Sequence, residues 1–286
     1  MEEKKGMPGW IKGCLTGCAV MLLLVVILLT FVCQQFKGMF QGVAEAENSF
    51  EQLTRELGEY DAYRPDPDVS VTASQLERFL RIRESMADDR ARMEDVFDSF
   101  DLTVDEELSG PRKVWSVLSE LGGLMNPAGQ YLAARNEQLL AEQMSMGEYS
   151  WIYGLAYHSW LGYEVTAGPK LSVDGEARDL FADSDSPFSP RQQQRRYRRV
   201  IGALLQNQID GASEGDPERL ALLQQEFGRF ENDIRSMIWK DGLPEAEAAV
   251  LEPYRERLEA TWHAPTNLME MPFPEEGSGA QFRIRP

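Results

Sequence analysis

Residues 14–33 read CLTGCAVMLLLVVILLTFVC, and this stretch decides the architecture of the chain because it holds twenty residues and no charge. At about 1.5 Å of rise per residue, a helix of this length matches the hydrocarbon core of a bilayer, about 30 Å. A cleaved signal peptide has a shorter apolar region of about 7–15 residues. The nearest Ala-x-Ala, at residues 44–46, lies more than ten residues beyond the stretch. We therefore expect an uncleaved, single-pass anchor that contacts the lipid bilayer.

Flanking lysines give the expected orientation of this anchor. Lys4, Lys5 and Lys12 precede it, whereas Lys37 is the one cation in the twenty residues that follow. Because cations are enriched on the cytoplasmic side of a membrane segment, residues 1–13 should be cytoplasmic and the rest periplasmic or extracellular. The chain has no Asn-x-Ser/Thr sequon, which favours a bacterial inner membrane over a glycosylated ectodomain.

The charge balance and the cysteines limit the classes of function. The chain has 29 Lys and Arg against 47 Asp and Glu, for a net charge of −18. Such an acidic surface repels phosphate backbones, so nucleic acid is not an expected partner. Cys14, Cys18 and Cys33 all belong to residues 14–33, so the remainder must fold without a disulfide.

Beyond the anchor, the sequence predicts a stalk, a domain and a tail. Apolar residues continue at helical spacing through residues 34–61, which predicts a juxtamembrane stalk helix that the segment Arg64-Pro65-Asp66-Pro67 ends. Residues 62–262 form an acidic helical domain. Residues 263–286 contain four prolines and two glycines, and we expect a poorly ordered tail.

Helix-start signals and apolar periodicity divide the domain into helices. Capping residues precede the apolar runs at Thr72, Ser145, Ser189 and Asp216. The expected helices cover residues 72–100, 111–125, 128–143, 145–161, 190–209, 217–240 and 244–262, the last of them kinked at Pro253, and residues 162–188 form a long loop. No segment shows sustained period-two alternation. We therefore expect an all-α fold, an irregular multi-helix bundle.

The segment 148–161 is rich in aromatic residues and carries the first set of candidate contact residues, Trp151, Tyr157, His158 and Trp160. Aromatic rings with polar tips suit a ligand pocket or an interface, since they bury a large area and still offer hydrogen bonds. They also suit the centre of a fold. The sequence leaves these interpretations open.

Five arginines within residues 191–199 make the second candidate set. On a helix, Arg191, Arg195 and Arg198 share one face, which suits an acidic partner or phosphate groups, or ion pairs within the chain. Arg83 and Arg90 lie on or beside a buried stripe, where they either pair with buried carboxylates or an anionic ligand, or extend to solvent.

No motif indicates a metal site, a cofactor or a catalytic centre. Two histidines, His158 and His263, are too few for a hydrolytic zinc site without cysteines in the domain. Gly-x-Ser-x-Gly and glycine-rich phosphate loops are absent. The acids of the 162–188 loop do not have the spacing of a helix-loop-helix calcium site.

These patterns together predict a membrane-anchored, non-enzymatic helical module of the cell envelope that binds a protein partner or itself. The alternative is a domain that binds a small apolar or anionic ligand in a pocket lined by the aromatic helix 148–161. An enzyme that uses dispersed carboxylates for acid–base chemistry cannot be identified from sequence, because the many acids supply unspecific pairs.

Overall fold

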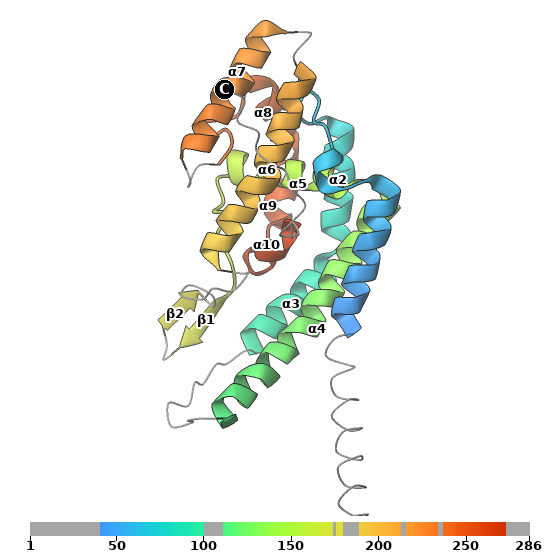
Figure 1. The fold of residues 1–286 in the computed structure, drawn as a ribbon, viewed down its shortest axis with the longest axis vertical. Coiled ribbons are helices and arrows are strands. Elements are labelled where there is room, and N and C mark those ends of the chain that lie inside the picture. Colours follow the sequence, from blue (N-terminus) through green and yellow to red (C-terminus); the bar gives the residue numbers. More distant parts are fainter. Residues whose placement is uncertain are drawn as a thin grey trace, which may run out of the picture.

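The computed structural model describes residues 41–99, 111–173, 176–179, 189–212, 216–233 and 237–272. Helices account for nearly all of the regular structure in these ranges, which confirms the predicted helical fold (Figure 1). The predicted cytoplasmic segment 1–13 and membrane segment 14–33 lie outside the described residues. Inside them, no helix has both the length and the apolar character needed to cross a bilayer.

The first described helix covers residues 41–57 and runs beside α4 (Pro111–Ala141), as the two adjacent ribbons of Figure 1 show. Two glycines allow the contact: a Cβ at Gly129 would lie 2.2 Å from the backbone carbon of Gly42. Asn136 Nδ2 donates to Ser49 Oγ (3.1 Å). This pair and the Gly42–Gly129 pair both join residues 87 positions apart in the sequence, so the two helices run parallel. Residues 41–57 of the predicted stalk are helical, and this helix packs against α4 because glycine permits close helix approach.

This helix ends earlier than predicted, and the chain turns back into the core. Gly58 has a φ of +85°, a conformation that suits glycine and stops the helix before the prolines. A short 3-10 helix, η1 (Tyr60–Ala62), follows. Leu53 and Tyr60 belong to the main hydrophobic core, so no domain boundary separates residues 41–61 from the rest.

The predicted helix 72–100 is two helices, α2 (Ala73–Ser85) and α3 (Ala87–Ser99). Its start is as predicted, because Thr72 Oγ1 accepts from the Gln75 amide and the Gln75 side chain accepts from the Thr72 amide. Met86 caps α2 with non-helical angles and is fully buried. The hydrophobic pattern continues across Met86, which is why periodicity alone missed the break.

The opposite correction applies to residues 111–143, where two predicted helices are one, α4. Pro127 lies inside this helix. Proline removes one backbone hydrogen bond and adds a steric clash, so a break was the local expectation. Packing of α4 between α3 and the helix of residues 41–57 opposes that local preference (Figure 1).

The aromatic segment forms α5 (Met146–Tyr153), which continues as a π-helix, η2 (Gly154–Trp160). Ser145 Oγ accepts from the Glu148 amide (3.1 Å), as the capping signal predicted. The Glu148 side chain does not complete a capping box, because it accepts from Arg78 (2.6 Å) instead. π-helical turns are rare and occur where a wider turn improves packing or serves a site.

The predicted loop 162–188 contains a short antiparallel hairpin, β1 (Lys170–Val173) and β2 (Glu176–Asp179), which sequence periodicity did not indicate. Two helices follow, α6 (Pro190–Ala212) and α7 (Pro217–Asn232). Asp216 caps α7 by accepting from two backbone amides. The described part of α7 ends at Asn232, earlier than the predicted residue 240.

The C-terminal helices correct the predicted tail. Pro253 splits residues 244–262 as expected, into α8 (Glu245–Leu251), a 3-10 turn η3 (Glu252–Tyr254) and α9 (Arg255–Thr261). Residues 264–270 then form α10 (Ala264–Glu270), whose last five residues are buried. The prediction of poor order is wrong for residues 263–272, because a local count of prolines cannot detect burial by distant segments. Residues 273–286 lie outside the described residues.

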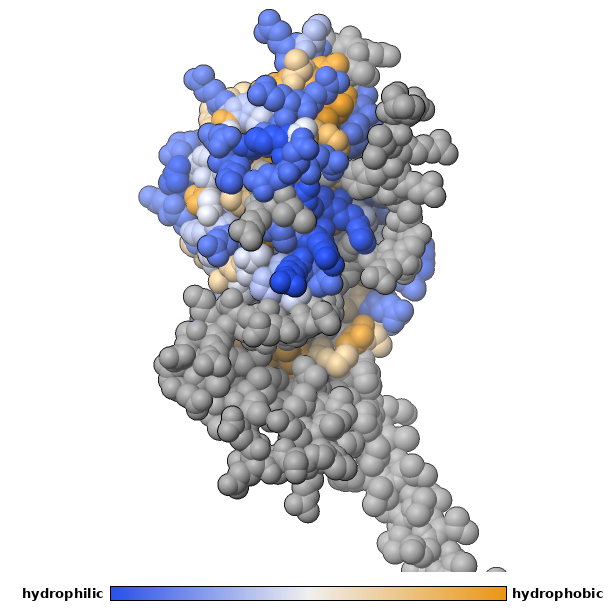
Figure 2. All heavy atoms as spheres, turned by 60° about the vertical axis from the view of Figure 1, so that its left-hand side comes forward, coloured by the Kyte–Doolittle hydropathy of each residue, from blue (hydrophilic) through white to orange (hydrophobic). Residues whose placement is uncertain are grey.

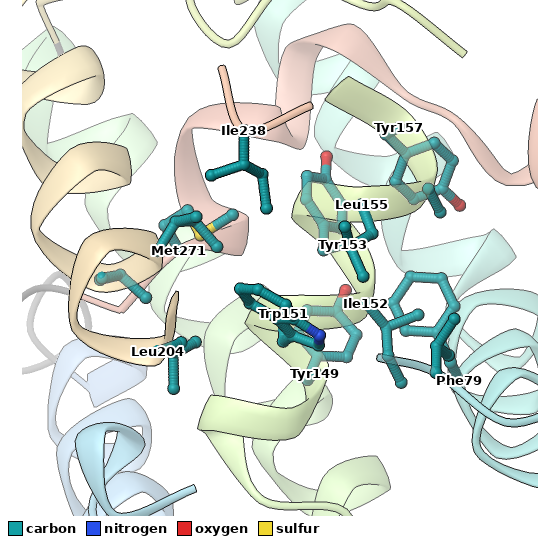
Figure 3. Packing of buried hydrophobic residues seen from close by; sticks show 14 of the residues in the cluster. Phe79, Tyr149, Trp151, Ile152, Tyr153, Leu155, Tyr157, Leu204, Ile238 and Met271 are labelled. Atoms are coloured by element: carbon teal, nitrogen blue, oxygen red, sulfur yellow. The ribbon is translucent and has the colours of Figure 1, made fainter. Parts of the chain in front are cut away.

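The main core surrounds α5 and η2. The rings of Tyr149, Tyr153 and Tyr157 lie in series, tilted against one another, at centroid separations of 6.0 and 4.7 Å (Figure 3). Phe79 of α2 lies against all three rings. Trp151 points the other way, toward Leu204 of α6, and its indole donates to the carbonyl of Ser70 (3.0 Å). The aromatic segment is therefore the centre of the bundle.

Candidate functional site

The predicted aromatic site is divided between core and surface. Trp151 and Tyr157 have no exposed surface, and the Tyr157 hydroxyl is bonded to Thr261 Oγ1 (2.8 Å). Their rings face neighbouring side chains (Figure 3). Both residues are thus used in packing. Of the predicted aromatic contacts, Trp160 is the one that reaches the surface of the described structure.

His158 is a buried histidine held in its neutral form. Its Nδ1 lies 2.8 Å from the carbonyl oxygen of Tyr163, and its ring meets Tyr197 and Trp262 edge-on. Burial lowers the pKa of His158 to about 4, although the bond to the Tyr163 carbonyl opposes that shift. Uncharged and enclosed, His158 has no access to a substrate in this structure.

A small cavity lies beside His158, between α6 and α10. The residues that line it include His158, Gln193, Arg196 and Asn267, and its volume is about 10 Å³. A cavity of this size holds about one water molecule, whereas a pocket for a small organic ligand measures some hundreds of Å³. The ligand-pocket alternative required such a pocket beside the aromatic helix, and this cavity does not provide it.

Trp160 ends the π-helix and is half-buried at the surface. The guanidinium of Arg255 lies 4.2 Å from the centre of its ring, a cation–π distance. Tyr163 and Trp262 stack nearby with centroids 4.5 Å apart. These partly exposed aromatic groups already have partners in the same chain. They offer an edge to another molecule and no preformed groove.

The arginine cluster of α6 has two roles that its sequence did not distinguish. Arg196 is buried and donates to the carbonyl of Leu268 (2.8 Å). Burial and the nearby Arg135 lower the pKa of Arg196 to about 10. Arg198 donates to the carbonyls of Asp233 (2.6 Å) and Glu231, at the end of α7. These two arginines hold neighbouring helices, and Arg198 therefore does not belong to the free face predicted for it.

Three arginines of the cluster remain exposed: Arg191, Arg195 and Arg199. They recur every four residues, so they follow one side of α6 over about 12 Å. No ion pair within the described part of the chain joins any of them to a carboxylate. Sequence reasoning identified Arg191 and Arg195 and missed Arg199, because helix geometry alone places Arg198 and Arg199 similarly close to that face.

A buried charge network joins the C-terminal helix to the core. Arg83 and Glu270 are both fully enclosed and form an ion pair. The carboxylate also accepts from the hydroxyls of Tyr131 (2.6 Å) and Tyr149 (2.7 Å), and the Arg83 guanidinium donates to the carbonyl of Thr261 (2.6 Å). The apolar-stripe position of Arg83 was the signal for a buried carboxylate partner.

This network has the chemistry of a structural clamp. Burial raises the pKa of Glu270, but Arg83, Arg135 and the two tyrosine hydroxyls outweigh that effect and leave the pKa below its usual value. A carboxylate that stays charged and enclosed by donors is a poor proton acceptor. Solvent does not reach it, so a substrate would have no path to it in this structure.

The surface of the described residues carries the candidate contacts that packing leaves free. In the described ranges, no three His, Cys, Asp or Glu side chains are placed to share a metal ion. The coloured part of the face seen in Figure 2 is largely hydrophilic, with small apolar patches. Of the predicted site residues, Arg191 and Arg195 on α6 are exposed, and Trp160 and Arg198 are partly exposed. No known protein-family model, curated protein or solved structure matches this chain.

Proposed function

We propose that this chain is a membrane-anchored, non-enzymatic module of the cell envelope that docks an acidic protein partner on the exposed arginines of α6. The observation that carries the proposal is the row Arg191, Arg195 and Arg199, which is exposed and unpaired with carboxylates among the described residues. In this proposal, residues 14–33 cross a bacterial inner membrane. The N-terminus is cytoplasmic and the domain is periplasmic or extracellular.

The acidity of the chain makes the lack of carboxylate partners along this row of arginines unexpected. A chain with a net charge of −18 has many acids with which surface arginines can pair, and several arginines elsewhere do so. Arg81 binds Glu142 (2.7 Å), and Arg257 binds both Glu77 (2.9 Å) and Glu84 (2.8 Å). Three arginines at four-residue spacing on one helix, without such pairs, therefore form a local cationic strip on an acidic molecule.

Such a strip favours partners with carboxylates at matching spacing. Guanidinium groups bind carboxylates through two parallel hydrogen bonds, which gives direction as well as attraction. The acidic remainder of the surface repels acidic partners elsewhere, so charge also selects the site of docking. An acidic helix or loop about 12 Å long would meet all three arginines.

The test is photo-crosslinking of the full chain in its native membrane. A photoreactive phenylalanine replaces Gln192, on the arginine side of α6, or Gln52, on the distant helix of residues 41–57. We expect a protein adduct at position 192 that weakens as salt is raised, because charge attraction is screened within about 8 Å at physiological ionic strength. Adduct formation that is equal at both positions would refute docking on α6.

A matched pair of charge reversals completes the experiment. Arg191→Glu with Arg195→Glu should abolish the adduct at position 192. Arg55→Glu with Arg64→Glu changes the net charge equally at two other exposed arginines and should leave the adduct intact. Loss of the adduct in both variants would mean that net charge matters and the strip does not, which would contradict the proposal.

A further inference from the structure

The helix of residues 41–57 keeps an apolar stripe that the fold does not cover. Val43 and Phe50 are each 37% exposed, and both are large apolar residues on the same helix. They are seven residues apart, and Leu57 continues the spacing as a partly buried member. In the sequence the same spacing extends back to Phe36. Seven-residue recurrence keeps these side chains on one side of a helix, as one of the two recurring positions of a helix–helix seam.

The helix divides its apolar residues between two faces. Gly42, Ser49 and Leu53 face the domain: Gly42 contacts Gly129, Ser49 accepts from Asn136, and Leu53 is 1% exposed. At about 100° per residue, Val43 and Phe50 lie at the border of that face and point beside α4. The fold therefore uses one half of the helix for its own core and leaves the other apolar edge open.

We infer that this edge, defined by Val43 and Phe50, pairs with the same edge of a second copy of the chain, in parallel and close to the membrane. The inference rests on the anchor that the proposed function includes. Residue 43 follows the predicted membrane segment by only ten residues, so two anchored copies present this helix at the same height and in the same direction. A two-fold axis along the membrane normal then places each stripe against its equivalent.

The size of the stripe decides where pairing occurs. A stable interface in solution buries about 800 Å² on each partner, and two or three partly exposed side chains supply far less. Confinement of both copies in a membrane raises their effective concentration and fixes their orientation, which permits pairing through a small contact. The stripe is therefore suited to copies that share a bilayer.

Disulfide trapping in native membranes tests this arrangement. Cys14, Cys18 and Cys33 are the only native cysteines, so the full chain with serine at these three positions is the background. Phe50→Cys should give a covalent dimer under mild oxidation. Gln52→Cys, also exposed and on the other side of the helix, should give at least fivefold less. Equal yields at the two positions, or no dimer at position 50, would overturn the inference.

A second measurement separates the stripe from the anchor. In lipid vesicles, energy transfer between donor-labelled and acceptor-labelled copies of the chain should exceed the level of random mixing for the native chain and fall to that level for Val43→Glu with Phe50→Glu. A dimer that persists in this variant is held by another contact and overturns the inference. The same variant should keep its crosslink at position 192. Loss of membrane association in cell fractionation would instead count against the anchor of the proposed function.

Discussion

Replacing Glu270 with glutamine should destabilise the fold far more than any change to a surface acid. The substitution keeps the shape of the side chain and removes its charge, which leaves the fully buried Arg83 without its counter-ion. Breaking a buried pair in this way costs about 3–5 kcal/mol, because an uncompensated charge remains in the interior. The amide also offers one acceptor oxygen where Tyr131 and Tyr149 both donate, so one hydroxyl loses its partner.

The magnitude translates into a thermal shift that circular dichroism can measure. For a domain of about 150–250 residues, 1 kcal/mol corresponds to about 2–4 °C, so Tm should fall by about 6–20 °C. Glu256→Gln removes an exposed acid and should change stability by less than about 0.5 kcal/mol. A Tm for Glu270→Gln equal to that of this control would refute the clamp.

Two further arms sharpen this test. Arg83→Met combined with Glu270→Met removes both charges, and its cost should be smaller than the sum of the two single changes, since neither charge is left unpaired. The folded pKa of Glu270 lies below its usual value, so its contribution is present above the ordinary carboxyl pKa and is lost as pH falls through the folded pKa. Stability of the native chain should therefore drop in acid more steeply than that of Glu270→Gln.

Two other predictions follow from the packing of the helices. Gly129→Ala should destabilise the fold by several kcal/mol, because the added Cβ would lie 2.2 Å from the Gly42 backbone. Gly228→Ala has nothing within 4 Å of its added Cβ and should stabilise the fold by up to about 1 kcal/mol, because alanine favours a helix more than glycine does. Urea unfolding of both variants measures the contrast. His158 has a folded pKa of about 4, so the unfolded chain binds its proton first, and the free energy of unfolding should fall by about 3 kcal/mol between pH 7 and pH 4. His158→Gln should remove that part of the pH dependence. An unchanged slope of unfolding free energy against pH would contradict the buried neutral state.

Local signals predicted the starts of helices well. Thr72 and Gln75 make the expected reciprocal bonds, and Asp216 caps α7 with Pro217 in its first turn. These signals are reliable because the donor and the acceptor lie within three residues of each other. The kink at Pro253 also has a local cause, because proline lacks a backbone hydrogen-bond donor.

Long-range contacts account for the features that sequence reasoning missed. Glu270 is 187 residues from Arg83, so nothing near residue 270 in the sequence indicates its burial. The local bias of Pro127 against a continuous helix is outweighed by packing on both sides of α4. For the same reason, the division of the α6 arginines into buried and exposed ones could not be predicted. Arg196 and Arg198 are sequence neighbours of the exposed Arg195 and Arg199, and only the placement of α10 and α7 gives them partners.

The buried arginines bind groups of the fold, whereas, among the described residues, the exposed arginines of α6 do not. A domain without disulfides must hold its last helix by other contacts, and here guanidinium groups donate to main-chain carbonyls of the C-terminal segment: Arg83 to Thr261, Arg135 to Met269 and Arg196 to Leu268. Each of these arginines has a structural task that accounts for its presence. Arg191 and Arg195 have no such task in the described structure, although acids are abundant in the chain. A guanidinium strip that the described part of the fold does not use is therefore the basis of our proposal that α6 docks an acidic partner.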